Sequence, residues 1–336
     1  MRRPMDNRCP PGPGVDSQAP LPEPSGACTR TTHAIAWHVS PPLAYSRGIN
    51  AWTSLPSPAA ALPGPRWVVA CDLDQTLIYS RRSFRLPSGA DEPDLVTVER
   101  IDGEPAAFCT TGAAELIVKL HATATLVPVT TRTRAQYERV DLGVRPQYAI
   151  TTNGGHLLLD GRPDEDWAAA VRGRIAAHAC PLADVRAAAQ RLAADGWVRV
   201  SRVADDLFVY LVAYERAGIP DLSGLAAGLA ADGWALSVQG RKVYLVPAVL
   251  TKEAALAEVM RRIGHARLAA AGDSLLDAGM LAGADLAVRP AHGELDDHRW
   301  TNPNLRVTSA SGLHGGQELL EIIAGELSAA RPCPGI

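Results

Sequence analysis

The sequence lacks the features that mark membrane, secreted and nucleic-acid-binding proteins. It has no apolar run of about 18 residues, so no transmembrane helix is expected. The basic N-terminus is not followed by the apolar segment of a signal peptide. Its 33 Lys and Arg residues are mixed with 36 Asp and Glu residues, so no basic surface for nucleic acid is indicated. These absences favour a cytoplasmic protein whose partner is a small molecule rather than a membrane or a nucleic acid.

Cysteine is scarce and follows no pattern. There is no Cys-x-x-Cys pair and no regular spacing, so neither a disulfide framework nor a zinc site is predicted. Reduced thiols, as in cytoplasmic proteins, are the expectation. The six cysteines are Cys9, Cys28, Cys71, Cys109, Cys180 and Cys333.

The distribution of residue types divides the 336 residues into four segments. Residues 1–65 are rich in Pro and Gly, and we expect them to form a disordered tail. Residues 66–155 and 250–330 alternate between strand-like and helix-like patterns, which is typical of a parallel α/β sheet. Residues 156–249 instead combine Ala-rich helices with paired strands. The prediction is an α/β fold: a Rossmann-like parallel sheet core, interrupted by an inserted α+β cap domain.

Hydrophobic periodicity and turn signals place the individual elements. In the core, we expect strands at 66–71, 125–129, 148–151, 268–271 and 285–288, a hairpin over 96–109, and helices at 111–121, 134–140, 252–263 and 275–282. In the insertion, we expect helices at 166–178, 182–194 and 222–231 and strands at 197–203, 207–212, 234–238 and 242–246.

Asp72 and Asp74 directly follow the first buried strand. Ligands of open α/β sheets bind at the carboxyl ends of strands. Two carboxylates there repel each other unless a cation separates them, and a divalent cation with oxygen ligands meets that need. One carboxylate could attack phosphorus, while the other protonates the leaving oxygen and later activates water. Taken alone, Asp-x-Asp-x-Thr is equally consistent with a polar turn.

A strand that ends in hydroxyl groups, Thr130-Thr131-Arg132, precedes a predicted helix. A helix N-terminus offers free amides and positive potential, and Thr130 adds a donor, so this is a candidate phosphate seat. The alternative is an ordinary threonine N-cap.

Lys252 follows the predicted N-cap Thr251, in the first turn of a helix. A cation there opposes the helix dipole at a cost of about 0.3–1 kcal/mol. The position of Lys252 in the first helical turn is explained if its side chain binds a phosphate and neighbouring carboxylates. The alternative is a solvated lysine offset by Glu253.

A buried strand ends at Gly272-Asp273, and Asp277 lies four residues further on. We expect Asp277 to fall one turn into the next helix, facing the same site as Asp273. Asp273 could ligate a metal ion. Asp277 could ligate the same ion, or it could orient Asp273 without contacting the ion. The alternative is a pair of helix-capping residues.

Together, these four motifs resemble those of the haloacid dehalogenase (HAD) superfamily of phosphohydrolases. Within it, the chain is similar to the Cof-type and sucrose-phosphate-phosphatase-like branch, which inserts a C2-type cap between its second and third motifs. Residues 156–249 stand in that place, and Asn153-Gly154-Gly155 resembles the entry to the cap. The resemblance covers about residues 66–327.

The resemblance implies a role for each motif residue and Mg²⁺ as the cofactor. Asp72 would be the nucleophile and Asp74 the general acid/base. The remaining roles would be phosphate binding by Thr130, Thr131 and Lys252, substrate binding by Arg132 and Asn153, and Mg²⁺ binding by Asp72, Asp74 (through its carbonyl), Asp273 and Asp277.

The sequence departs from the family at several points. Gln75 and Thr131 stand where the family usually has Gly, and residues 288–293 replace a Gly-Asn-Ala segment. The stretch between Thr76 and Thr111 is longer than usual and carries its own hairpin. These departures bear on the substrate more than on the chemistry.

The expected function is a Mg²⁺-dependent phosphatase that hydrolyses a small phosphorylated metabolite, a sugar phosphate first of all, through an aspartyl phosphate. A phosphotransferase or phosphomutase with the same site is one alternative. A non-catalytic HAD-like protein that binds metal or phosphate is another. The sequence does not determine the substrate or the oligomeric state.

Two further groups of residues suggest sites but have simpler explanations. His292 and His298 flank an acidic stretch, which we expect to be an exposed polar loop rather than a metal cluster. Trp197, Trp234 and Tyr244 are expected to pack within the cap.

Overall fold

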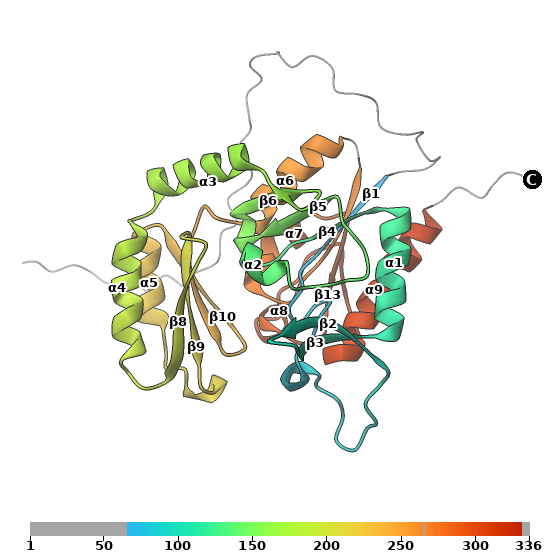
Figure 1. Cartoon of the computed structure of the whole chain (residues 1–336), viewed down its shortest axis with the longest axis horizontal. Coiled ribbons are helices and arrows are strands. Elements are labelled where there is room, and N and C mark those ends of the chain that lie inside the picture. Colours follow the sequence, from blue (N-terminus) through green and yellow to red (C-terminus); the bar gives the residue numbers. More distant parts are fainter. Residues whose placement is uncertain (1–65, 265, 331–336) are drawn as a thin grey trace, which may run out of the picture. The chain divides into compact units, whose positions relative to one another are not determined.

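The structure is a computed structural model that describes residues 66–264 and 266–330 (Figure 1). The tail expected to be disordered, residues 1–65, lies outside the described residues. Among the described residues, no helix has both the length and the apolar character needed to cross a membrane.

The core is a five-stranded sheet in which all neighbouring strands run parallel. Its strand order is β14-β13-β12-β1-β4, so β1 lies between β4 and β12. A bridge from Val129 to Ile150 places β5 next to β4. The predicted Rossmann-like parallel core is therefore confirmed. The five strands of the sheet are β1 (Trp67–Cys71), β4 (Thr125–Pro128), β12 (Arg267–Ala271), β13 (Leu286–Arg289) and β14 (Leu305–Val307). The adjoining strand β5 is Tyr148–Thr151.

Strand β1 is buried throughout because helices cover both faces of the sheet. Val68 and Ala70 belong to the core cluster that includes α6 and α7, whereas Val69 and Cys71 belong to the cluster that includes α1 and α9. This division follows the two-residue period of a strand. The helices are α1 (Thr111–Thr123), α6 (Lys252–Ile263), α7 (Ala278–Ala282) and α9 (Gly312–Ala329).

The insertion contains a four-stranded antiparallel sheet in the order β10-β11-β9-β8. Helix α4 packs on β8 and β9, and α5 packs on β10. The α+β character predicted for this block is confirmed. Its elements are α3 (Glu165–His178), α4 (Leu182–Ala193), β8 (Val198–Ala204), β9 (Phe208–Ala213), η3 (Arg216–Gly218), α5 (Ser223–Ala231), β10 (Trp234–Gln239) and β11 (Lys242–Pro247).

Two short strands at the start of the insertion extend the core instead of joining the antiparallel sheet. β6 (His156–Leu159) pairs with β5, and β7 (Arg162–Pro163) pairs with β6. Neither strand was predicted from the sequence. The main antiparallel sheet and its helices thus begin only after residue 163.

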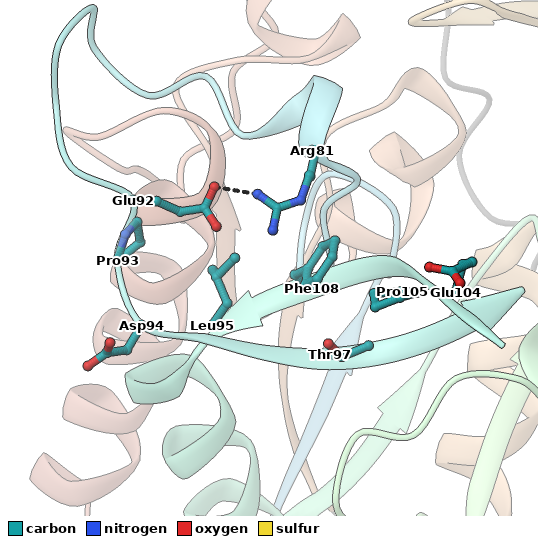
Figure 2. A pocket seen from close by; sticks show the side chains of 9 residues that line it. All are labelled: Arg81, Glu92, Pro93, Asp94, Leu95, Thr97, Glu104, Pro105 and Phe108. Carbon is teal, nitrogen blue, oxygen red and sulfur yellow. Dashed lines mark hydrogen bonds and ion pairs between the residues drawn. The ribbon is translucent and has the colours of Figure 1, made fainter.

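The predicted hairpin is present as β2 (Leu95–Ile101) and β3 (Glu104–Thr110). Asp102 and Gly103 both have positive φ, at 51° and 86°, as a two-residue turn of this kind requires. A hollow of about 530 Å³ lies beside this hairpin. Figure 2 shows the side chains that line it. Arg81 crosses it, paired with Glu92 and stacked 5.0 Å from the Phe108 ring centroid. The cation of this hollow is therefore already neutralised.

Helix α9 was not expected from the sequence, because its first turns contain Gly312, Gly315 and Gly316. These glycines allow close packing. A Cβ at Gly316 would lie 2.8 Å from the carbonyl oxygen of Thr76, in the loop that follows β1.

The single helix predicted at 275–282 is divided in the structure into the 3₁₀ turn η4 (Leu275–Asp277) and the helix α7. Shorter elements are η1 (Arg81–Ser83), α2 (Arg134–Tyr137), η2 (Thr152–Gly154) and α8 (Glu294–Asp297).

Candidate active site

The carboxyl ends of three adjacent strands carry the predicted site residues. Asp72 follows β1, Thr130 lies just beyond β4, and Asp273 lies just beyond β12. The backbone N–H of Asp72 donates to the Ala271 carbonyl at 2.9 Å, which joins the ends of β1 and β12. Parallel pairing thus brings together side chains that are about two hundred residues apart in sequence.

Three buried carboxylates form a cluster at this edge of the sheet. Each of Asp72, Asp273 and Asp277 offers an oxygen, and these oxygens all lie within 4.8 Å of one another. Lys252 lies beside them and is 1% exposed. Its Nζ is 2.6 Å from Asp72 Oδ1 and 2.5 Å from Asp277 Oδ1. The solvated position that was the alternative for Lys252 is therefore excluded.

The three buried carboxylates carry more negative charge than the single positive charge of Lys252 can balance. Burial raises the pKa of Asp72 to about 7, although Lys252 opposes the shift. Burial, with Asp72 and Asp277 nearby, raises the pKa of Asp273 well above its ordinary range. Burial lowers the pKa of Lys252, but Asp277 and Asp72 outweigh this and raise it overall. The lysine is therefore a fixed cation, and a second cation would relieve the remaining repulsion.

A hard divalent cation fits these residues. Its preferred ligands are oxygens, and the cluster offers Asp72 and Asp273 from two neighbouring strand ends and Asp277 from η4. The oxygens of Asp277 already accept from Lys252 and from Ser274, so Asp277 fits a supporting position better than a direct one.

Two glycines permit the tight approach of the loops. A Cβ at Gly272 would lie 2.4 Å from Asp277 Cγ, and a Cβ at Gly293 would lie 2.6 Å from Asp273 Oδ2. Larger residues at these positions would displace the carboxylates.

Asp74 is separated from this cluster by its own partners. Arg132 donates to both of its carboxylate oxygens, at 3.0 and 2.9 Å, and Arg132 Nη1 lies 2.8 Å from Glu99 Oε2. Lys242 Nζ, from the insertion, lies 3.9 Å from Asp74. Burial opposes ionisation of Asp74, but Arg132 and Lys242 hold its pKa below the ordinary range. Asp74 is therefore a carboxylate at neutral pH.

The two threonines lie between strand β4 and the short helix α2. Thr130 is fully buried, and its Oγ1 accepts from the backbone N–H of Arg132 at 3.1 Å. Thr131 Oγ1 donates to Tyr244 Oη at 3.4 Å. The N-cap of α2 is Thr133, whose side chain accepts from the N–H of Gln136. The N-cap alternative for Thr130 is thus wrong, because the cap belongs to Thr133.

Asn153 joins the two segments through which the chain enters and leaves the insertion. Its Nδ2 donates to the Leu250 carbonyl at 2.7 Å, and its backbone has a positive φ of 56°. The next residue, Gly154, has φ of 97°, and a Cβ there would lie 2.3 Å from the Thr251 carbonyl oxygen. The Asn153-Gly154 pair therefore allows the two backbone segments to pass close to each other at the base of the insertion.

His292 corrects one expectation. The segment around it was expected to be an exposed loop, but His292 is buried. Its Nδ1 accepts from the Gly312 N–H at 2.9 Å, so its Nε2 carries the proton and donates to the Gln75 carbonyl at 2.9 Å. Burial lowers its pKa to about 4, which keeps the ring neutral. His292 thus supports the loop after β1.

Sequence reasoning missed three residues that contact or frame the site: Glu99, Lys242 and Glu294. Glu99 was placed in the hairpin but given no role, because an acid that alternates with apolar residues in a strand is expected to face solvent. Lys242 and Glu294 gave no signal, because their partners are distant in sequence. Tyr244 packs against Phe208 and Tyr210 as expected, but its hydroxyl also meets Thr131.

A cleft of about 580 Å³ opens beside Asp74. One wall comes from the loop after β1 and the segment that follows it, and the other from the β10–β11 turn and η3 of the insertion. Arg132 and Lys242 line it together with Asp74. A molecule in this cleft would therefore contact both the core and the insertion.

No model of a protein family and no curated protein matches the sequence. The three-dimensional structure, by contrast, is similar to several solved structures. Sucrose-phosphatase from Synechocystis sp. PCC6803, in complex with sucrose and phosphate, is 16% identical with a TM-score of 0.54, over 78% of this chain and 98% of that one. A phosphatase of the haloalkanoate (HAD) superfamily from Bacteroides thetaiotaomicron is 14% identical with a TM-score of 0.50, over 81% and 99%.

A HAD subclass IIB sugar phosphatase is 13% identical with a TM-score of 0.50, over 77% of this chain and 99% of that one. Because the sequence identity is so low, these matches show similarity of fold only. They confirm the predicted resemblance at that level, including the α+β block inserted into a parallel sheet. The chain has the fold of the HAD superfamily phosphatases.

Proposed function

We propose that the chain is a Mg²⁺-dependent phosphatase that acts on a small phosphorylated metabolite. The observation that carries this proposal is the buried group of Asp72, Asp273, Asp277 and Lys252 at the carboxyl end of the sheet. Burying so many charged groups is costly, and clusters of this kind are found mainly at functional sites. A phosphorylated sugar is the favoured substrate, because two of the similar folds belong to a sucrose-phosphatase and a sugar phosphatase.

Asp72 and Asp273 would hold the Mg²⁺, with the Asp74 carbonyl as a further ligand and Asp277 in support. When bound, the ion supplies positive charge that offsets the charge of the phosphoryl oxygens. Lys252 supplies a second positive charge from the protein itself. Thr130 and Thr131 would bind the same phosphoryl group through hydrogen bonds, because they lie at the end of the neighbouring strand β4.

In the first step, a carboxylate oxygen of Asp72 attacks phosphorus, and the bond from phosphorus to the substrate oxygen breaks. The bonding electron pair leaves with that oxygen, which takes a proton from Asp74. Asp74 gains this proton beforehand, when the bound anionic substrate draws Arg132 away and raises the pKa of Asp74. In the second step, water attacks the phosphorus of the aspartyl phosphate, and Asp74 takes the proton from the water. Phosphate leaves and Asp72 is restored.

Residues 156–249 would act as the cap of this site, and they would select the substrate through the wall of the cleft that they provide. Arg132 and Asn153 would contribute to substrate binding from the core side. We propose a cytoplasmic location for this chemistry, in keeping with the unpatterned cysteines.

Hydrolysis of an aryl phosphate by the purified protein tests the proposal. We expect release of inorganic phosphate that requires Mg²⁺, stops with EDTA and is lost in Asp72→Asn. Adding a sugar acceptor separates hydrolysis from transfer, since a transferase would form a new phosphate ester. Mg²⁺-dependent binding without any turnover would instead indicate a non-catalytic protein.

A further inference from the structure

The cleft beside Asp74 contains more positive than negative side chains. This surplus is local, because the whole chain has a formal net charge of −3. It comes from both walls, so the core and the insertion each contribute cations. The basic residues are Arg82, Arg85, Arg132, Arg216, Arg241 and Lys242, and the acidic residues are Asp74, Glu99 and Glu215.

Some of these cations are neutralised within the protein. Arg132 pairs with Asp74 and Glu99, and Arg216 Nη2 lies 2.7 Å from Asp297 Oδ2. Arg82, Arg85 and Arg241, by contrast, have no carboxylate within ion-pair distance in the part of the chain that the structure describes. The cleft therefore keeps three guanidinium groups without an anionic partner.

Arg85 follows Phe84, which is buried in a cluster with Phe108 and Leu313. Its backbone has φ of 53°, a left-handed conformation that is unfavourable for a residue with a Cβ. The Leu313 N–H donates to the carbonyl of the preceding residue, Phe84, at 3.0 Å, which anchors this strained turn on α9. Strain of this kind persists where surrounding contacts enforce it, and it is common at ligand sites.

The side chain of Arg85 points toward the reaction centre. Its Nη2 donates to Gln75 Oε1 at 3.4 Å, and Gln75 Nε2 donates to Asp273 Oδ2 at 3.4 Å. One side chain thus separates Arg85 from the metal-binding cluster. From the opposite wall, Arg241 is fixed by a bond of 3.1 Å from its Nη1 to the Tyr214 carbonyl.

We propose that this cleft binds a second anionic group of the substrate, a carboxylate or a second phosphate, through Arg85 and Arg241. The inference rests on the proposed function, since it takes the first phosphoryl group to lie at Asp72. Guanidinium groups suit this role because their planar donors match carboxylate and phosphate oxygens. The transferred phosphoryl group already has Lys252 and the metal cluster as its partners.

Binding to the Asp72→Asn protein with Mg²⁺, measured by calorimetry, tests this without turnover. The ligands are matched pairs: glycerol phosphate against phosphoglycerate, which adds a carboxylate, and a hexose monophosphate against the hexose bisphosphate, which adds a phosphate. We expect the more anionic member of at least one pair to bind about tenfold tighter or more. The pair that shows the preference tells the carboxylate and the phosphate apart.

The preference should fall below about threefold when Arg85→Gln and Arg241→Gln are added together. Arg186→Gln, an exposed arginine on α4 in the insertion, is the matched control and should leave the preference unchanged. Equal affinities within both pairs would overturn the inference, as would a preference that survives the double variant. Failure of the wild-type protein to hydrolyse aryl phosphate would overturn the proposed function instead, while the binding comparison would still decide this inference.

Discussion

Arg132 binds the carboxylate of Asp74 with two hydrogen bonds, from Nε to Oδ2 at 3.0 Å and from Nη2 to Oδ1 at 2.9 Å. Its remaining nitrogen, Nη1, lies 2.8 Å from Glu99. The pair fixes the orientation of Asp74 and keeps it ionised, as its proposed role as the general base for water requires. An anionic substrate that drew Arg132 away would raise the pKa of Asp74 toward that of a proton donor.

Arg132→Gln should reduce kcat/KM by about 100-fold to 1000-fold, because Asp74 loses the group that orients it. The pKa of Asp74 should also rise toward its ordinary range, which a pH profile of the variant can detect. Arg139→Gln is the control, because Arg139 contacts Glu99 at 3.1 Å but not Asp74. Equal losses in the two variants would show that the network, and not the bond to Asp74, is what matters.

Lys252→Met should destabilise the metal-free protein by about 3–5 kcal/mol, because it leaves Asp72 and Asp277 buried without their cation. Urea unfolding measures this loss. Adding Asp277→Asn to Lys252→Met should recover part of it, since one uncompensated charge is removed. Additive losses in the double variant would contradict the coupling of these two residues.

Glu294 ties the insertion to the core, and its loss should loosen that connection. Its carboxylate accepts from Ser237 Oγ and the Val238 N–H on β10, at 2.8 and 3.1 Å, and from the Leu275 N–H at 2.9 Å. Glu294→Ala should cost about 1–3 kcal/mol, because several buried donors lose their acceptor.

Limited proteolysis within residues 156–249 should detect the loosening in Glu294→Ala. Ser237→Ala removes only one of the three bonds and should have a smaller effect. Unchanged protection in the Glu294 variant would mean that other contacts hold the insertion in place.

The affinity for Mg²⁺ should rise with pH between about 5 and 7. Burial raises the pKa of Asp72 to about 7, whereas an unfolded aspartate has a pKa of about 3.9. Between these values the folded, metal-free protein binds more protons than the unfolded chain, so its stability falls as pH rises. Mg²⁺ requires the ionised form and must displace that proton.

Titration calorimetry with Mg²⁺ tests this proton release. Below pH 7, affinity should change by about tenfold per pH unit for each proton released. The heat of binding should also vary with the ionisation enthalpy of the buffer. Affinity that is constant between pH 5 and about 7 would show that Asp72 is already ionised without the metal.

Local signals in the sequence predicted the sheet core and most of the site. Asp72 ends a buried strand, and Lys252 stands where a helix should not have a cation, so each position was unusual by itself. Glu99 was missed because it contacts Arg132 from the β2–β3 hairpin, and Lys242 was missed because it approaches Asp74 from the insertion. Helix α9 was missed because Gly315 and Gly316 lower helix propensity, although Gly316 allows close contact with the loop after β1.

Asp72 is the proposed nucleophile for the phosphoryl group, and the hydrolysis rate of Asp72→Asn measures that role. With Mg²⁺ and an aryl phosphate, we predict a loss of at least about 1000-fold in kcat, since an amide cannot form the aspartyl phosphate. Asp195→Asn, at an exposed position of the insertion, is the matched control and should keep wild-type activity. An Asp72→Asn protein that hydrolyses the ester at the wild-type rate would contradict the account.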